Sequence, residues 1–172
     1  PEGWIRFLDH TGIETTVLYP SSLLSWARIS YVDWSIAICR AYNDWFYERY
    51  LQFSPRFKGV AVLPAQEPEA SAEELRRCVK EFGMVAGLLP GNGLKSHLGS
   101  KEYWPIYREA EALDVAIAIH GSVHSGMGFD TYNVYAPAQA FGHPFSLMIS
   151  FGGIIFHGIL DRFPGLRVGF LE

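Results

Sequence analysis

Short apolar runs that stop at a proline or a polar residue alternate with amphipathic segments along the whole chain. The run over 59–63, for example, stops at Pro64 and is followed by helical spacing over 67–82. No hairpin signal separates one run from the next. Strands that alternate with helices predict a parallel sheet. Near-continuous apolar strands agree, because parallel sheets are covered on both faces.

The runs predict strands and the segments between them predict helices. Strands are expected over 15–19, 59–63, 85–89, 115–120 and 167–172. Helices are expected over 31–50, 67–82, 102–113 and 144–163, with a long loop over 121–136 before the last of these. We expect the very apolar stretch 145–160 to be buried, and the helix to be interrupted near Gly152 and Gly153.

A parallel order alone permits an open doubly wound sheet or a closed barrel. Within 115–120, Ile117 and Ile119 point to one face, whereas Ala118 and His120 point to the other. Large β-branched residues suit packing under helices, and small residues leading to a polar one suit a barrel interior. This pattern favours an α/β barrel, in which functional groups lie at the carboxyl ends of the strands.

Length and composition exclude several classes of protein. With 172 residues the chain is expected to form one domain, 1–172. A net charge of −4 without a basic block argues against nucleic-acid binding. Two distant cysteines support neither a disulfide framework nor a cysteine zinc site, and they fit a cytoplasmic protein. No signal peptide and no apolar run of membrane-spanning length is found, so we expect no membrane partner.

Phosphate-loop, dinucleotide-binding and nucleophile-elbow patterns are missing, so histidines and acids are the candidates for chemistry. His120 ends a central strand, where a neutral imidazole could bind a metal ion, although a buried structural histidine is an equal reading. Glu172 ends the next strand and could serve as a metal ligand or general base, or be a solvated acid. His124 and His143 flank the long loop; either could contact a substrate, while a surface or turn role is the simpler alternative.

Several segments, taken together and in order, resemble the amidohydrolase-related family, which includes aminocarboxymuconate semialdehyde decarboxylase and γ-resorcylate decarboxylase. The segments are AYNDW at 41–45, RFKGVAVLP at 56–64, ELRRCV at 74–79, YREAE at 107–111 leading to His120, and GILDRFPGLRV at 158–168. The resemblance implies a metal-dependent (β/α)₈ TIM barrel, usually with zinc, of which this chain holds about five βα units, the second to the sixth strands.

The resemblance also implies roles for single residues. His120 becomes the metal ligand after the fifth barrel strand. Glu172 stands where the decarboxylases carry a catalytic histidine, and this difference favours hydrolysis. The remaining ligands, a His-x-His pair and an aspartate, are expected before residue 1 and after residue 172. The chain is therefore expected to be an internal slice of a longer enzyme.

The sequence thus predicts a metal-dependent hydrolase acting on a small carbonyl compound such as an amide, ester or lactone. A divalent metal, expected to be Zn²⁺ and held by His120, would activate water, with Glu172 as the catalytic residue and His124 and His143 contacting the substrate. One alternative is a decarboxylase or hydratase of aromatic or muconate-type acids. Another is a non-catalytic barrel fragment. Because open edge strands favour association, we expect a homo-oligomer.

Overall fold

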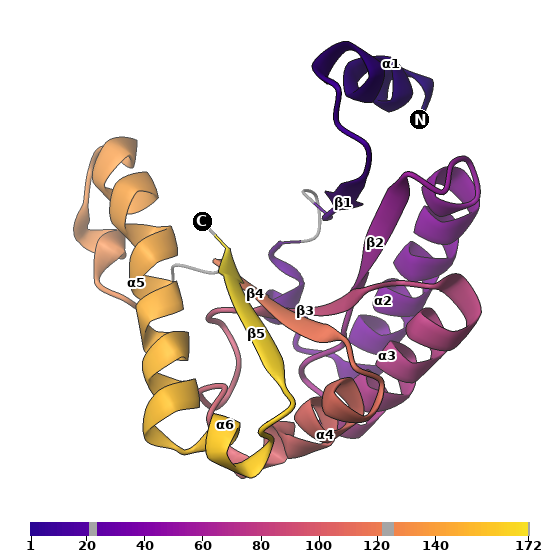
Figure 1. The fold of residues 1–172 in the computed structure, drawn as a ribbon. Coiled ribbons are helices and arrows are strands. Elements are labelled where there is room, and N and C mark those ends of the chain that lie inside the picture. The colour runs from indigo at the N-terminus through magenta and orange to yellow at the C-terminus, as the bar shows by residue number, and fades with distance from the viewer. Residues whose placement is uncertain (21–23, 122–125, 172) are drawn as a thin grey trace.

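A parallel sheet with helices packed on it forms the framework of the molecule in the computed structural model, which describes residues 1–20, 24–121 and 126–171 (Figure 1). Within these residues the strands are β1 (Thr16–Leu18), β2 (Phe57–Val62), β3 (Ala86–Pro90), β4 (Ala116–His120) and β5 (Arg167–Leu171). The α-helices are α1 (Glu2–Thr11), α2 (Val32–Phe46), α3 (Pro68–Phe82), α4 (Trp104–Ala112), α5 (Tyr135–Phe156) and α6 (Ile159–Arg162). Shorter helical turns include η1 (Trp26–Arg28), η2 (Tyr47–Leu51) and η3 (Lys101–Tyr103).

The order of the strands decides between an open sheet and a barrel. Every strand pairs in parallel with the next one along the chain, in the order β1-β2-β3-β4-β5. A doubly wound sheet would reverse direction at a switch point. Right-handed crossovers without a reversal keep the helices on one side, and α2, α3 and α4 do lie side by side there (Figure 1). The predicted α/β arc of a TIM barrel is confirmed.

The two faces of β4 carry the side chains that the alternation predicts. Ile117 and Ile119 belong to the core beneath the helices, where they join Tyr107 of α4. Ala118 belongs to a second cluster with Leu88 on the opposite face. His120 lies on this second face as well, at the carboxyl end of the strand.

A buried amide completes the sheet where β1 is too short to do so. β1 pairs with β2 only as far as Gly59. Farther along, the side chain of Asn43 takes the place of a neighbouring strand: it donates to the carbonyl oxygen of Val62 and accepts from the Val62 N–H, both at 3.0 Å. The same amide donates to the buried Glu74 at 2.8 Å, and Glu74 is paired with Arg77 at 2.7 Å. Three of the segments that carry the family resemblance, 41–45, 56–64 and 74–79, are therefore joined in one hydrogen-bonded network.

Helix α5 differs from the expected one in where it begins and ends. It starts at Tyr135 instead of 144, so that Pro144 lies inside it, and the last two residues of the expected loop belong to the helix. It continues through Gly152 and Gly153 and ends at Phe156. The change of direction comes at Gly158, whose φ is +64°. Gly153 has a packing role instead, since a Cβ on this residue would lie 3.2 Å from the backbone nitrogen of Gly99.

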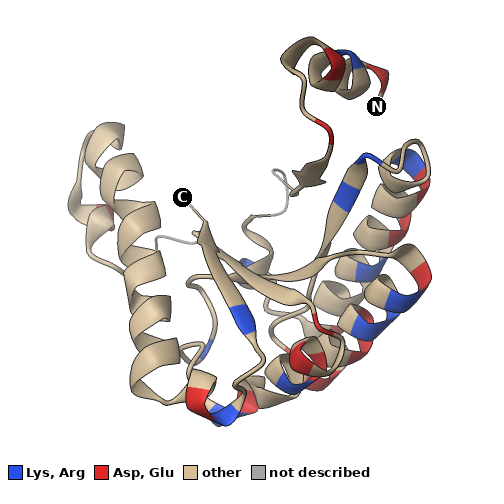
Figure 2. Cartoon of the chain, in the orientation of Figure 1, with Lys and Arg blue, Asp and Glu red and all other residues tan. Residues whose placement is uncertain are grey.

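Burial of this helix is also less than expected. Ser146, Ser150 and Ile154 are buried, but Met148 is 65% and Phe156 is 88% exposed. The whole of α5 carries no charged residue (Figure 2). The expectation of a buried helix is therefore wrong for its outer face. An apolar sequence indicates which side chains avoid water, but not whether a neighbouring element covers them. Among the described residues, no helix is both long and apolar enough to cross a membrane.

Candidate functional site

The imidazole of His120 is held in one orientation by its own neighbour in the chain. His120 is buried at the end of β4, and its Nδ1 lies 2.6 Å from the carbonyl oxygen of Gly121. A carbonyl oxygen can only accept a hydrogen bond, so Nδ1 is the nitrogen that carries the proton. In the neutral ring Nε2 is then unprotonated and able to bind a metal ion. Metal-binding histidines commonly donate their other N–H to a backbone carbonyl in this way.

The backbone carbonyl of His120 is linked to helix α5 through Gly91. The Gly91 N–H, just after β3, donates to the carbonyl oxygen of His120 at 2.7 Å. The carbonyl oxygen of Gly91 accepts from the hydroxyl of Ser150 at 2.6 Å. Ser150 is buried on α5, so this helix is fixed to the carboxyl ends of β3 and β4.

His143 lies beside His120 because α5 begins early enough to include it. The ring centroids of the two histidines are 6.0 Å apart and their planes meet at 85°. His143 also packs over Gly121, where a Cβ would be 3.0 Å from Cγ of the imidazole. The structure therefore brings these two predicted site residues together. His124 and Glu172 lie outside the described residues, although Leu171, which precedes Glu172, is the register partner of His120.

The part of the chain that the structure describes fits one ligand of a metal site but not a complete coordination shell. No three His, Cys, Asp or Glu side chains within it are close enough to hold an ion together. An unprotonated imidazole nitrogen such as Nε2 of His120 is a suitable donor for a divalent ion. Such an ion would need further ligands from outside the described residues.

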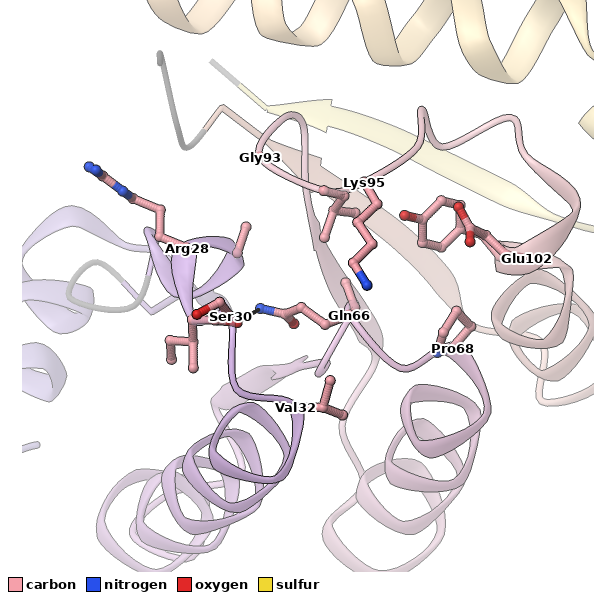
Figure 3. Close-up of a pocket in the computed structure, with 13 residues that line it drawn as sticks. Arg28, Ser30, Val32, Gln66, Pro68, Gly93, Lys95 and Glu102 are labelled. Atoms are coloured by element: carbon pink, nitrogen blue, oxygen red, sulfur yellow. Dashed lines mark hydrogen bonds between the residues drawn. The ribbon is translucent and has the colours of Figure 1, made fainter. Parts of the chain in front are cut away.

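A separate cavity lies at the same edge of the sheet, with a volume of about 440 Å³ (Figure 3). Its walls come from η1, from η3 and from the residues that follow β2 and β3. Neither His120 nor His143 lines it. At the carboxyl edge of the sheet this cavity is thus separate from the pair formed by His120 and His143.

Sequence reasoning missed the residues that support His120. Gly121 has no side chain, and Ser150 acts here only as a hydrogen-bond donor, so a search for reactive side chains passes over both. A usable signal was the presence of Ser146 and Ser150 in an otherwise apolar helix, since buried hydroxyls require partners. Lys95, which lines the cavity, stands in the stretch GNGLKS at 91–96, where Leu94 separates Gly93 from the lysine and so breaks the phosphate-loop pattern.

Comparison with known proteins establishes the family. The model of the amidohydrolase family matches residues 9–171. The chain belongs to this family. It is 33% identical to the γ-resorcylate decarboxylase of Polaromonas sp. strain JS666, covering 95% of this chain and 52% of that protein. It is 29% identical to the 2-amino-3-carboxymuconate-6-semialdehyde decarboxylase of Dictyostelium discoideum, covering 99% of this chain and 46% of that protein.

A solved structure from the same family agrees with the fold. The dihydroxybenzoic acid decarboxylase of Polaromonas, with bound manganese and the inhibitor 2-nitroresorcinol, superimposes with a TM-score of 0.82 at 27% identity. The match covers 98% of this chain and 53% of that one. The chain thus spans about half the length of these family members.

The expectation of a hydrolase is wrong, because the relatives that match nearly the whole chain are decarboxylases. That expectation depended on Glu172 standing in place of a histidine. Both side chains can transfer protons, so one such difference does not determine the reaction. Similarity spread over the whole chain carries more weight. The expected zinc is not supported either, whereas a divalent metal is, since the Polaromonas structure holds manganese.

Proposed function

We propose that this family member is a metal-dependent, non-oxidative decarboxylase of a small aromatic or muconate-type acid. The observation that carries the proposal is the similarity of 95% or more of the chain to two kinds of decarboxylase, γ-resorcylate decarboxylase and 2-amino-3-carboxymuconate-6-semialdehyde decarboxylase. Both names describe unsaturated acids that lose a carboxyl group. The geometry of His120 supports it, since the contact of Nδ1 with the Gly121 carbonyl makes Nε2 the unprotonated nitrogen of the neutral ring, at the strand end where barrel sites lie.

His120 would hold the divalent ion, together with ligands outside the described residues. When bound, the ion would polarise the oxygens of the substrate and stabilise the negative charge that builds up as the carboxyl group departs. In the overall reaction the bond between the carboxyl carbon and the substrate carbon breaks, CO₂ leaves, and a proton takes its place. We assign delivery of that proton to Glu172, and contacts with the substrate to His143 and His124.

Two measurements test the proposal. Loaded with manganese, the protein is expected to release CO₂ from γ-resorcylate or from 2-amino-3-carboxymuconate-6-semialdehyde. His120→Ala should lose both the metal and the activity, whereas Glu172→Gln should keep the metal and lose activity. CO₂ release is followed by isotope trapping, and metal content by mass spectrometry. Full metal retention in His120→Ala would remove the ligand assignment. A metal-loaded protein that releases CO₂ from neither acid would overturn the reaction class.

Chelation distinguishes the enzyme from a non-catalytic barrel. If a divalent ion is a resident cofactor, removing it lowers stability, because an ion that binds only the folded state stabilises it. Unchanged thermal stability after chelation, with no metal found beforehand, would favour a scaffold. The predicted homo-oligomer is part of the same proposal, and sedimentation velocity at several protein concentrations would test it.

A further inference from the structure

The cavity between the loops after β1, β2 and β3 has walls that are already fixed. The side-chain amide of Gln66 donates to the carbonyl oxygens of Trp26 at 2.8 Å and Ile29 at 3.0 Å. Its oxygen accepts from the Ser35 hydroxyl at 2.8 Å. The Trp26 indole N–H donates to the Leu63 carbonyl at 2.7 Å. The loop after β1 is thereby bonded to the end of β2, so the cavity is preformed, as small-molecule sites usually are.

Charge around the cavity is arranged to favour an anion. Lys95 extends its ammonium group towards Gln66 and the interior (Figure 3). In the described part of the chain it makes no ion pair and no side-chain hydrogen bond. The guanidinium of Arg28 points away from Lys95, and Glu102 supplies the single carboxylate at the wall (Figure 3). The lining residues thus carry two cations and one carboxylate, a net charge of +1, and of the two cations Lys95 is the one directed inward.

The remaining walls are apolar or neutral. Ile29, Val32 and Leu94 offer aliphatic surface. Tyr103 donates its hydroxyl to the carbonyl oxygen of Ser96 at 3.3 Å. Burial, with a smaller contribution from the Glu102 carboxylate, raises the pKa of Tyr103 to about 12, so its ring stays neutral. A volume of about 440 Å³ accommodates a ring-sized ligand.

We propose that this cavity is a second ligand site, which binds a small organic acid through its carboxylate to Lys95 and through its apolar body to Ile29, Val32 and Leu94. Because the cavity shares no residue with the pair formed by His120 and His143, the proposal is independent of the decarboxylase function.

Benzoate is a simple probe of this chemistry, and benzamide is its neutral counterpart of the same shape. Each is titrated into the ¹⁵N-labelled protein while amide resonances are followed by NMR. Benzoate is expected to shift the signals of Ala65, Gln66 and Leu94, and benzamide to bind more weakly. Lys95→Gln should raise the Kd of benzoate about fivefold, the upper range for an exposed ion pair. Lys80→Gln, an exposed lysine on α3, is the matched control and should leave the Kd unchanged.

His120→Ala separates this site from the proposed active site. It should leave benzoate binding at the cavity unchanged, even if the decarboxylase proposal fails. An unchanged Kd in Lys95→Gln would overturn the second site, as would the absence of shifts at Ala65 and Leu94 up to the solubility limit of benzoate. Shifts confined to Gly121, and lost in His120→Ala, would place benzoate at the histidine pair and overturn it as well.

Discussion

The imidazole of His143 packs directly against the backbone of Gly121, so closely that a Cβ at Gly121 would overlap with Nδ1 of the ring. The φ angle of Gly121 is outside the left-handed region, so an alanine there would suffer a steric clash and no backbone strain. Gly121→Ala is expected to push His143 away from His120 and to destabilise the protein by roughly 1–3 kcal/mol, as overpacking does. Urea unfolding measures the loss.

Gly169 provides the matched control, because a Cβ on this residue of β5 meets no atom within 4 Å. Gly169→Ala should therefore cost far less than Gly121→Ala. Equal stability of the two variants would show that the contact between Gly121 and His143 is less tight in solution than in the structure.

Ser150 is expected to act as a positioning residue for His120. Its hydroxyl holds the Gly91 carbonyl, and Gly91 in turn holds the His120 carbonyl. Ser150→Ala should lower the free energy of unfolding by about 1–2 kcal/mol, the cost of a lost buried hydrogen bond. It should also weaken manganese binding, measured by calorimetry, because the strand end that carries the ligand becomes less ordered. Ser25→Ala, at an exposed position, should change neither quantity.

The network around Asn43 should matter for stability and not for the metal. Asn43→Leu leaves the N–H and carbonyl of Val62 and the carboxylate of Glu74 without this partner, so we expect a loss of roughly 2–4 kcal/mol in urea unfolding. Asn133→Leu, on an exposed loop, should cost under about 0.5 kcal/mol. Manganese affinity should match the wild type in the fraction that remains folded. A fall in affinity like that of Ser150→Ala would mean that general loss of stability, not local positioning, controls the metal site.

The sheet could be predicted from the sequence because each strand is a local pattern. Four of its strands stop near a proline or a polar residue that limits their extension, and alternation within β4 assigned Ile117 and His120 to opposite faces correctly. The structure adds the sequential pairing, which selects the barrel over the doubly wound sheet. Local patterns contain no information on which strands are neighbours.

Helix α5 could not be placed as well, for a different physical reason. Pro144 looked like a first-turn residue, because proline lacks the N–H that a helix interior uses. Another proline, Pro137, occupies the first turn in the structure and was the better signal. The contacts of Gly121 with His143 and of Gly91 with Ser150 join residues distant in sequence, and no single local pattern reveals them.

Both cysteines should be unreactive while the protein is folded. Burial raises the pKa of Cys39 to about 12, and burial together with the Glu74 carboxylate raises that of Cys78. Because the thiolate is the reactive form, iodoacetamide at pH 8 should label neither thiol until guanidinium unfolds the chain, which mass spectrometry can follow. Rapid labelling of the folded protein would contradict the buried positions.

The same shifts predict a loss of stability in alkaline solution. Between pH 9 and 12 the unfolded chain releases the Cys39 proton while the folded chain retains it, starting from an ordinary pKa of 9.0. The unfolded state then binds fewer protons, so the free energy of unfolding falls as pH rises, by up to about 1.4 kcal/mol per pH unit for one group. Below pH 9 this contribution is constant. Tyr42, whose pKa burial also raises to about 12, acts in the same direction at higher pH. Urea unfolding from pH 8 to 10.5 should show the decline, and Cys39→Ala should make it shallower; the same slope in both proteins would exclude Cys39 as its source.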